Sequence, residues 1–193
     1  MSRTLIIVVV IAIALGFYGC SSYNGLVEKD TQVDQAWAQV QTQYQRRSDL
    51  IPNLVNTVKG AANFEKSTLE AVIKARASAT GINLSADQLT PENIQKFQAA
   101  QDQLSGSLSR LLAVAESYPQ LKATQNFSEL QAQLEGTENR IAVARNDFNG
   151  AATNYNASVR SFPNNIFAGI FGFQRRGLFE ASKAAQNAPT VQF

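Results

Sequence analysis

The sequence has 193 residues, 45% of them hydrophobic, and its 17 basic and 15 acidic residues leave a net charge of +2. That length supplies one domain with a sizeable core, while the small charge lacks the basic surplus of nucleic-acid-binding proteins. The chain has no histidine and one cysteine, which excludes a histidine base, an intrachain disulfide and a cysteine-based zinc site. We therefore expect no cofactor, no metal and no nucleic-acid partner, and no small-molecule substrate is identified.

The amino-terminal residues predict a membrane anchor, which we place at residues 1–22. Residues 4–20 carry no charge, and a helix of that length reaches about 25 Å, close to the thickness of a bilayer core. A cleaved signal peptide also begins with a basic residue and an apolar run, but the A-x-A-like cleavage site is missing. The anchor is therefore expected to remain uncleaved.

A lipidated Cys20 is the alternative form of anchor, because a small residue precedes it and two serines follow. Phe17 and Tyr18 depart from the usual lipobox, so we favour the uncleaved helix. The basic Arg3 before the span predicts a cytoplasmic amino terminus and an extracytoplasmic body, in a single-pass membrane protein.

Three small residues of the anchor recur at every fourth position: Ala12, Gly16 and Cys20. They share one helical face, the pattern that lets helices approach closely in a bilayer, although incidental small residues explain it equally well.

Beyond the anchor, apolar residues recur at helical spacing in long blocks, and no segment alternates as a strand would. We predict an all-α fold, with an up-and-down antiparallel bundle of the four-helix type at residues 23–162. The first stripe continues from the anchor without a break and predicts one helix with Trp37 buried. Its members are Tyr23, Leu26, Val33, Trp37, Val40, Tyr44, Ile51, Leu54 and Val58. Pro52 predicts a kink in this helix, which resumes to Ala79 before a left-handed cap at Gly81.

Two further helices have recognisable ends. The first is expected to begin at Thr90 as N-cap with Pro91 in the first turn, and to end at Tyr118, which precedes a proline. The second is expected to begin at Asn126, with a glutamate three residues later for a capping box, and to end before Pro163.

The tail, residues 163–193, begins with an aromatic, glycine-punctuated segment too short to span a membrane. It is expected to pack on the bundle, on the membrane interface or on a neighbouring protomer. The contact candidates are Phe167, Ile170, Phe171 and Phe173.

A charged group lies just before Pro52 and has two interpretations. Arg46, Arg47 and Asp49 could form a partner-binding or lipid-headgroup patch. Alternatively, Arg47 lies on the apolar stripe, with its stem packed and its guanidinium paired to Glu138 or Asp147 of another helix. We favour the pairing, because long charged side chains often lie at bundle seams.

Three carboxylates, Glu135, Glu138 and Asp147, could be read as a general acid and base. Catalysis requires convergence in a pocket with perturbed pKa values, whereas a solvated helix face requires nothing special. We therefore predict no catalytic residues.

Several stretches of the sequence form recognisable motifs: Tyr23-Asn24-Gly25-Leu26-Val27, Ala36-Trp37, Arg46-Arg47-Ser48-Asp49-Leu50-Ile51-Pro52-Asn53-Leu54-Val55, Val58-Lys59-Gly60, Tyr118-Pro119-Gln120-Leu121-Lys122-Ala123, Thr137-Glu138-Asn139-Arg140-Ile141-Ala142-Val143-Ala144-Arg145 and Phe162-Pro163-Asn164-Asn165. Together these stretches resemble the LemA family of bacterial envelope proteins. The resemblance implies an amino-terminal anchor, an up-and-down helical bundle and no established enzymatic activity. On it we select as structural or partner-contact candidates Tyr23, Asn24, Trp37, Arg46, Arg47, Asp49, Pro52 and Asn53.

Two functions are consistent with these features. The first is a non-enzymatic, membrane-anchored scaffold that self-assembles as a homo-oligomer or organises other envelope proteins. The alternative is a lipoprotein-like module that presents its bundle to a membrane protein partner, such as a peptidase system, as the family resemblance implies.

Overall fold

The computed structural model describes residues 2–60 and 65–180. In these residues the chain is all-α without strands, which confirms the predicted fold class. The elements in chain order are α1 (Arg3–Lys59), α2 (Lys66–Thr80), the 3-10 turn η1 (Ala86–Gln88), α3 (Pro91–Ala115), α4 (Pro119–Lys122), α5 (Gln125–Arg160) and α6 (Asn164–Phe171).

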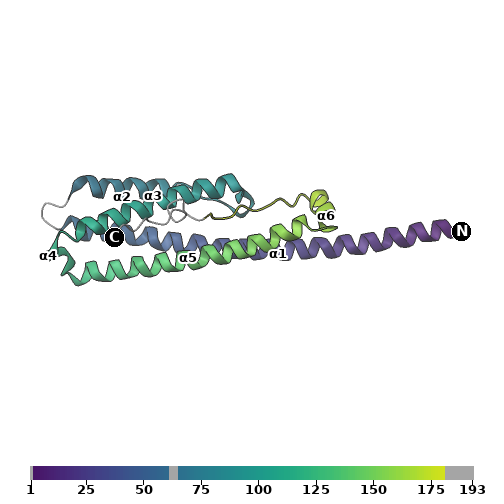
Figure 1. Ribbon diagram of the computed structural model, residues 1–193, viewed down its shortest axis with the longest axis horizontal. Coiled ribbons are helices and arrows are strands. Elements are labelled where there is room, and N and C mark those ends of the chain that lie inside the picture. Colours follow the sequence, from purple (N-terminus) through teal and green to yellow (C-terminus); the bar gives the residue numbers. More distant parts are fainter. Residues whose placement is uncertain (1, 61–64, 181–193) are drawn as a thin grey trace, which may run out of the picture.

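Helix α1 contains both the segment predicted as the anchor and the first helix of the body. Its 57 residues correspond to about 85 Å, and its amino-terminal part projects alone from the body (Figure 1). The large apolar side chains between Leu5 and Tyr18 are exposed, and the helix is long and apolar enough to cross a membrane. The prediction of one helix that continues from the apolar amino-terminal segment into the body is confirmed.

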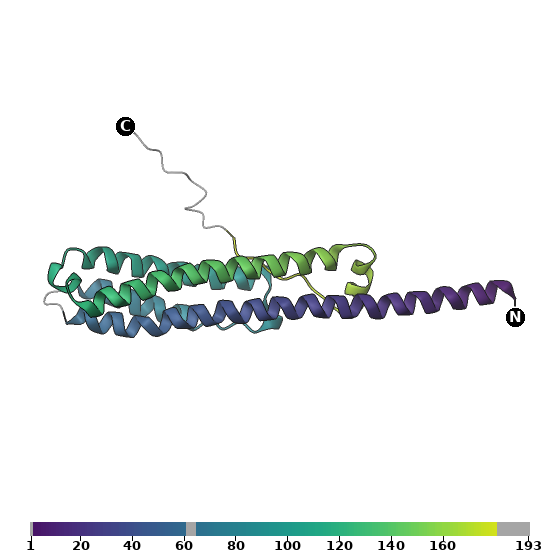
Figure 2. The same cartoon turned by 90° about the horizontal axis from the view of Figure 1, so that it is seen from below.

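The other long helices lie beside the carboxy-terminal part of α1 (Figures 1 and 2). Helix α1 packs mainly along α5, and α2 packs mainly along α3. Consecutive long helices run in opposite directions, and α4 lies at the end of the body farthest from the anchor (Figure 1). Helix α6 lies at the opposite end, where the anchor emerges.

The predicted continuation of the first helix to Ala79 is wrong. Helix α1 passes through Pro52 but ends at Lys59, and α2 is a separate helix that packs beside α3. Val58 and Leu69 are both buried, and their separation of eleven residues is three helical turns. The apolar period therefore continues across the break and could not reveal it.

Pro52 leaves a backbone carbonyl free, and α2 uses it. A proline has no N–H to donate to the carbonyl four residues earlier, which here belongs to Ser48. Arg76 of α2 donates its Nε–H to that oxygen at 3.0 Å. The proline is thus accommodated by a contact between helices.

Pro52→Ala should leave the fold intact and raise the free energy of unfolding by about 1 kcal/mol, because the new N–H pairs with Ser48. Arg76→Leu alone should lower it by about 1 kcal/mol, and by less when residue 52 is alanine. Urea unfolding of the four proteins followed by circular dichroism measures both effects. Loss of the fold in Pro52→Ala would show that the proline sets the local conformation instead.

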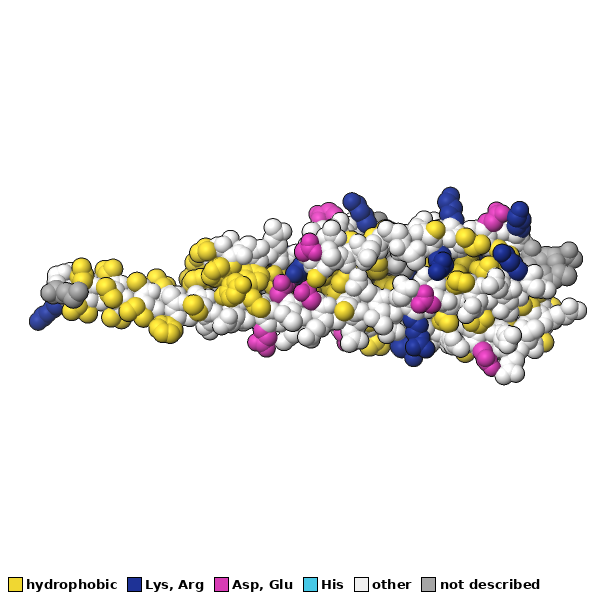
Figure 3. Space-filling model, turned by 180° about the vertical axis from the view of Figure 1, so that it is seen from behind, with side chains coloured by type: hydrophobic (Ala, Val, Ile, Leu, Met, Phe, Trp, Pro, Cys, Tyr) yellow, Lys and Arg dark blue, Asp and Glu magenta, His cyan; other side chains and the backbone are white. Residues whose placement is uncertain are grey.

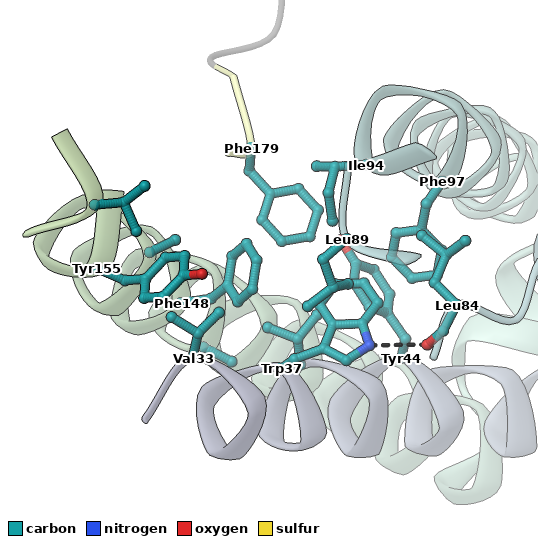
Figure 4. Packing of buried hydrophobic residues seen from close by; sticks show 14 of the residues in the cluster. Val33, Trp37, Tyr44, Leu84, Leu89, Ile94, Phe97, Phe148, Tyr155 and Phe179 are labelled. Carbon is teal, nitrogen blue, oxygen red and sulfur yellow. Dashed lines mark hydrogen bonds between the residues drawn. The ribbon is translucent and has the colours of Figure 1, made fainter. Parts of the chain in front are cut away.

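The core consists of two apolar clusters along the body. The cluster nearer the anchor surrounds Trp37 and includes Phe97, Phe148, Tyr155 and Phe179 (Figure 4). The second cluster is mainly aliphatic, with Phe127 as its buried aromatic residue, and is shared by α1, α2, α3, α4 and α5. Trp37 is 2% exposed, as predicted, and its indole N–H donates to the carbonyl oxygen of Leu84 at 3.0 Å.

The helix ends agree with the sequence in part. Thr90 caps α3 by accepting a hydrogen bond from the backbone N–H of Asn93 at 3.3 Å, as expected. Helix α3 ends at Ala115, slightly before the predicted Tyr118. The capping box at Asn126 is wrong, because α5 begins one residue earlier without a side-chain cap. Gly81 is also not left-handed, since its φ is −72°.

Candidate functional site

Helix α6, which we call the collar, packs against the last turns of the apolar part of α1. The ring of Phe167 lies over Gly19, where an added Cβ would be 3.0 Å from a ring carbon. Tyr18 contacts the same ring at a centroid distance of 5.6 Å, and Tyr23 contacts Phe171 at 5.0 Å. Glycine at position 19 therefore permits the close approach of the two helices.

Hydrogen bonds fix the start of the collar on α1. Tyr18 and Ser22 donate their hydroxyl protons to Oδ1 of Asn164 at 3.0 and 3.1 Å. Gly172 ends the collar in the left-handed conformation, with φ of 77°, and the chain then returns along the body (Figure 1).

Residues 173–180, which we call the strap, are held through their backbone by side-chain amides. Each of three amides both accepts from an N–H and donates to a carbonyl of the same strap residue, at 2.8 to 3.1 Å. The pairs are Asn156 with Arg176, Asn149 with Phe179, and Gln98 with Glu180.

Two strap side chains anchor it to the body. Phe179 is 5% exposed and stacks on Trp37 at a centroid distance of 6.1 Å (Figure 4), with the guanidinium of Arg145 4.6 Å from its ring centre. The guanidinium of Arg176 donates to Oδ1 of Asp30 at 2.7 and 3.0 Å. One aromatic and one ionic contact thus complement the backbone pairs.

Burial around Arg176 disfavours negative charge on the neighbouring groups. Desolvation raises the pKa of Asp34, with a further increase from Asp30 that Arg176 opposes. Desolvation and the charge of Asp30 raise the pKa of Tyr155 to about 12, again opposed by Arg176. Arg176 therefore reduces the electrostatic strain among the groups that it contacts.

Gly177→Ala should release the strap, because a Cβ there would lie 2.8 Å from the carbonyl oxygen of Thr90 and 2.9 Å from Pro91. We expect the free energy of unfolding to fall by about 1–3 kcal/mol and the backbone amides of the strap to exchange hydrogen faster. Gly106→Ala is the matched control, because a Cβ at this position of α3 meets open space. This substitution should stabilise the helix by up to about 1 kcal/mol. Unchanged exchange at the Phe179 amide would contradict the prediction.

Arg47 forms a polar layer between the two apolar clusters. Its side chain is 1% exposed and pairs with Glu138 at 2.7 Å, which confirms the predicted ion pair. Its guanidinium also donates to Ser105 and to the side-chain oxygen of Gln101 at 2.6 and 2.5 Å, and lies 5.0 Å from the ring centre of Tyr44. The buried charge is therefore multiply hydrogen-bonded.

Comparison with known proteins bears directly on these elements. A family model described as the LemA family matches residues 36–193. The chain belongs to the LemA family. The matched region contains α2 to α6 and the strap, whereas the apolar part of α1 precedes it.

The chain is also similar to individual proteins of known name. The chain is 27% identical to the magnetosome protein MamQ 2 of Paramagnetospirillum magneticum, over 88% of this chain and 68% of the relative. It is 26% identical to the magnetosome protein MamQ of Magnetospirillum gryphiswaldense over the same shares. It is 24% identical to the protein LemA of Metamycoplasma hominis, over 83% of this chain and 69% of the relative.

The other predicted contact residues of this LemA-family protein are dispersed. Arg46, Asp49 and Asn53 line an open surface groove of about 1000 Å³, apart from the collar and strap. Asn24 and Pro52 are exposed on α1.

The three small residues of the anchor, Ala12, Gly16 and Cys20, are exposed, so their contacts remain a prediction. Of the predicted contact residues in the tail, three contact α1 and one is exposed. Phe167 and Phe171 contact α1, Phe173 contacts Tyr23 at 5.7 Å, and Ile170 is 69% exposed. Residues 181–193 of the predicted tail lie outside the described part of the chain.

The carboxylates considered for catalysis are not gathered into one site. Glu138 is engaged with Arg47, and Glu135 accepts from Gln131 on the exposed face of α5. Asp147 is exposed. Among residues 2–60 and 65–180, no group of three Asp, Glu, Cys or His side chains could hold a metal ion.

Sequence reasoning missed Gly19 and the residues that hold the strap. One signal was available, because Asn149 and Asn156 are seven residues apart and each directly follows a buried aromatic residue, Phe148 and Tyr155. Such spacing places both amides along one side of the helix. The partners of these amides are backbone groups of the strap, and a pattern of side chains in the sequence does not predict such partners.

Proposed function

We propose that this protein is a non-enzymatic, membrane-anchored scaffold of the bacterial envelope, which self-assembles or organises partner proteins at the membrane. The main support is α1, in which an exposed apolar segment continues directly into the core of the body. No linker separates the two parts, so the body lies immediately beside the bilayer. We further propose a bundle of the four-helix type made by α1, α2, α3 and α5.

The names of the relatives support the non-enzymatic part of this proposal. Their names describe magnetosome proteins and LemA, and none of those names is that of an enzyme. For this chain we propose an amino terminus in the cytoplasm, because Arg3 precedes the span, and a body outside it.

Crosslinking in native membranes tests the scaffold. Copies with two different tags should be captured together after amine crosslinking, and Gly16→Leu should reduce capture by crowding the small-residue face. Gly106→Leu, on an open site of α3, should leave capture unchanged. Recovery of monomers alone at all expression levels, with no other envelope protein attached, would overturn the proposal.

Topology is tested with single cysteines in a Cys20→Ser background. Asn139→Cys, on the exposed side of α5, should react with an impermeant maleimide in intact cells. Ser2→Cys should react only after lysis. The reverse pattern would place the body in the cytoplasm, and a diacylglyceryl-modified Cys20 in the native protein would replace the uncleaved anchor by a lipid anchor.

A further inference from the structure

The collar lies at the height where α1 leaves the membrane. A bilayer core about 30 Å thick takes about 20 helical residues, and the uncharged run begins at Thr4. The span therefore ends close to Tyr23. The collar contacts α1 at Tyr18, Gly19 and Tyr23, so it shares the level of the last turns of the span.

The collar presents an apolar surface away from α1. Its eight residues carry no charge, and Ile166 and Ile170, one turn apart, are 52% and 69% exposed. Phe162, just before the collar, is 82% exposed. Figure 3 shows hydrophobic side chains continuing from the anchor onto the adjoining end of the body, with charged side chains gathered farther along the body.

Phe167 and Phe171 attach one side of the collar to α1, while Ile166 and Ile170 occupy the outward side. Large exposed apolar side chains that gather in one place mark an interaction surface. A short helix with an outward apolar side at bilayer height fits the boundary between headgroups and acyl chains.

We propose that the collar is a second membrane-contacting element, with Phe162, Ile166 and Ile170 inserted into the interfacial region of the bilayer. This inference rests on the proposed membrane anchoring of α1. The left-handed Gly172 then directs the chain back from the lipid, and the Phe173 N–H donates to the Ala168 oxygen at 2.9 Å. The protein thereby contacts the bilayer through two segments far apart in sequence.

Depth-dependent fluorescence quenching tests the collar in the full-length protein. In a Cys20→Ser background, Ile166→Cys or Ile170→Cys carries an NBD label, and one copy is placed in each nanodisc of phosphatidylcholine and phosphatidylglycerol. Nitroxides near the headgroup or deep in the acyl chain are the quenchers. Val143→Cys, 60% exposed on α5, is the matched control, and Phe17→Cys reports on the span.

Labels at positions 166 and 170 should show blue-shifted emission and quenching by the shallow nitroxide comparable to that at position 17, with little at position 143. Positions 166 and 170 behaving like 143 while position 17 is quenched would overturn the collar contact alone. An unquenched position 17 would overturn the anchoring itself. A blue shift found only in vesicles that hold many copies would show that a neighbouring protomer covers the collar, and would also overturn the proposal.

Discussion

Trp37→Ala is expected to destabilise the protein by about 3–5 kcal/mol, a large share of the 5–15 kcal/mol that holds a typical domain folded. The indole lies between Phe97 and Phe148 at centroid distances of 5.2 and 5.4 Å. Its removal opens a cavity where α1, α3, α5 and the strap meet. Urea unfolding of the full-length protein in detergent, followed by circular dichroism, measures the loss.

Trp37→Phe is the matched control for this cavity. It retains an aromatic ring and loses the indole N–H, while Gln41 still donates to the carbonyl oxygen of Leu84 at 3.0 Å. We expect a smaller loss, of about 1 kcal/mol from the hydrogen bond with a further contribution from lost packing. An unchanged urea midpoint for Trp37→Ala would show that the indole does not support the fold.

Arg47→Ala is expected to have a comparable effect, about 3–5 kcal/mol, because it leaves a cavity and removes the donor that Gln101 and Ser105 use. The ion pair itself contributes little of this, since the Glu138 side chain is 43% exposed and water can solvate it once the arginine is gone. Unfolding in urea measures the loss in the free energy of unfolding. The same measurement in guanidinium chloride, a salt that screens charge, shows how much of the loss is electrostatic.

Arg47→Met separates volume from charge. Methionine fills the channel that the arginine stem occupies, but it supplies no donor to Gln101 and Ser105. It should therefore recover the part of the stability lost in Arg47→Ala that comes from the cavity. A loss as large as that of alanine would show that the hydrogen bonds to Gln101 and Ser105, and not packing, stabilise this layer.

The features that the sequence predicted correctly depend on local patterns. Trp37 and Arg47 lie on one helical stripe, so burial of the first and pairing of the second follow from spacing along α1. Thr90 before Pro91 is a local capping signal. Each of these features was predicted from residues nearby in the sequence, although the partner of Arg47, Glu138, lies 91 residues away.

The features that it missed depend on the meeting of distant segments. Gly19 is packed because Phe167, 148 residues later, lies over it. The small-residue face of α1, in contrast, was predicted only from the spacing of residues along the helix. The strap has no helical period, and Gly177 is required by the backbone of Thr90 and Pro91. Tertiary contact, rather than local preference, determines these positions.

The unbroken course of α1 has a mechanical consequence. From Tyr23 to Lys59 the helix extends about 54 Å, and it has no joint at the bilayer surface. Membrane helices incline by about 20° on average, by an amount that depends on bilayer thickness. At that inclination the end of the body at Lys59 is displaced sideways by roughly 18 Å relative to an upright helix. With the membrane span proposed for α1, the helix would therefore act as a lever, because any change in its tilt moves the far end of the body sideways.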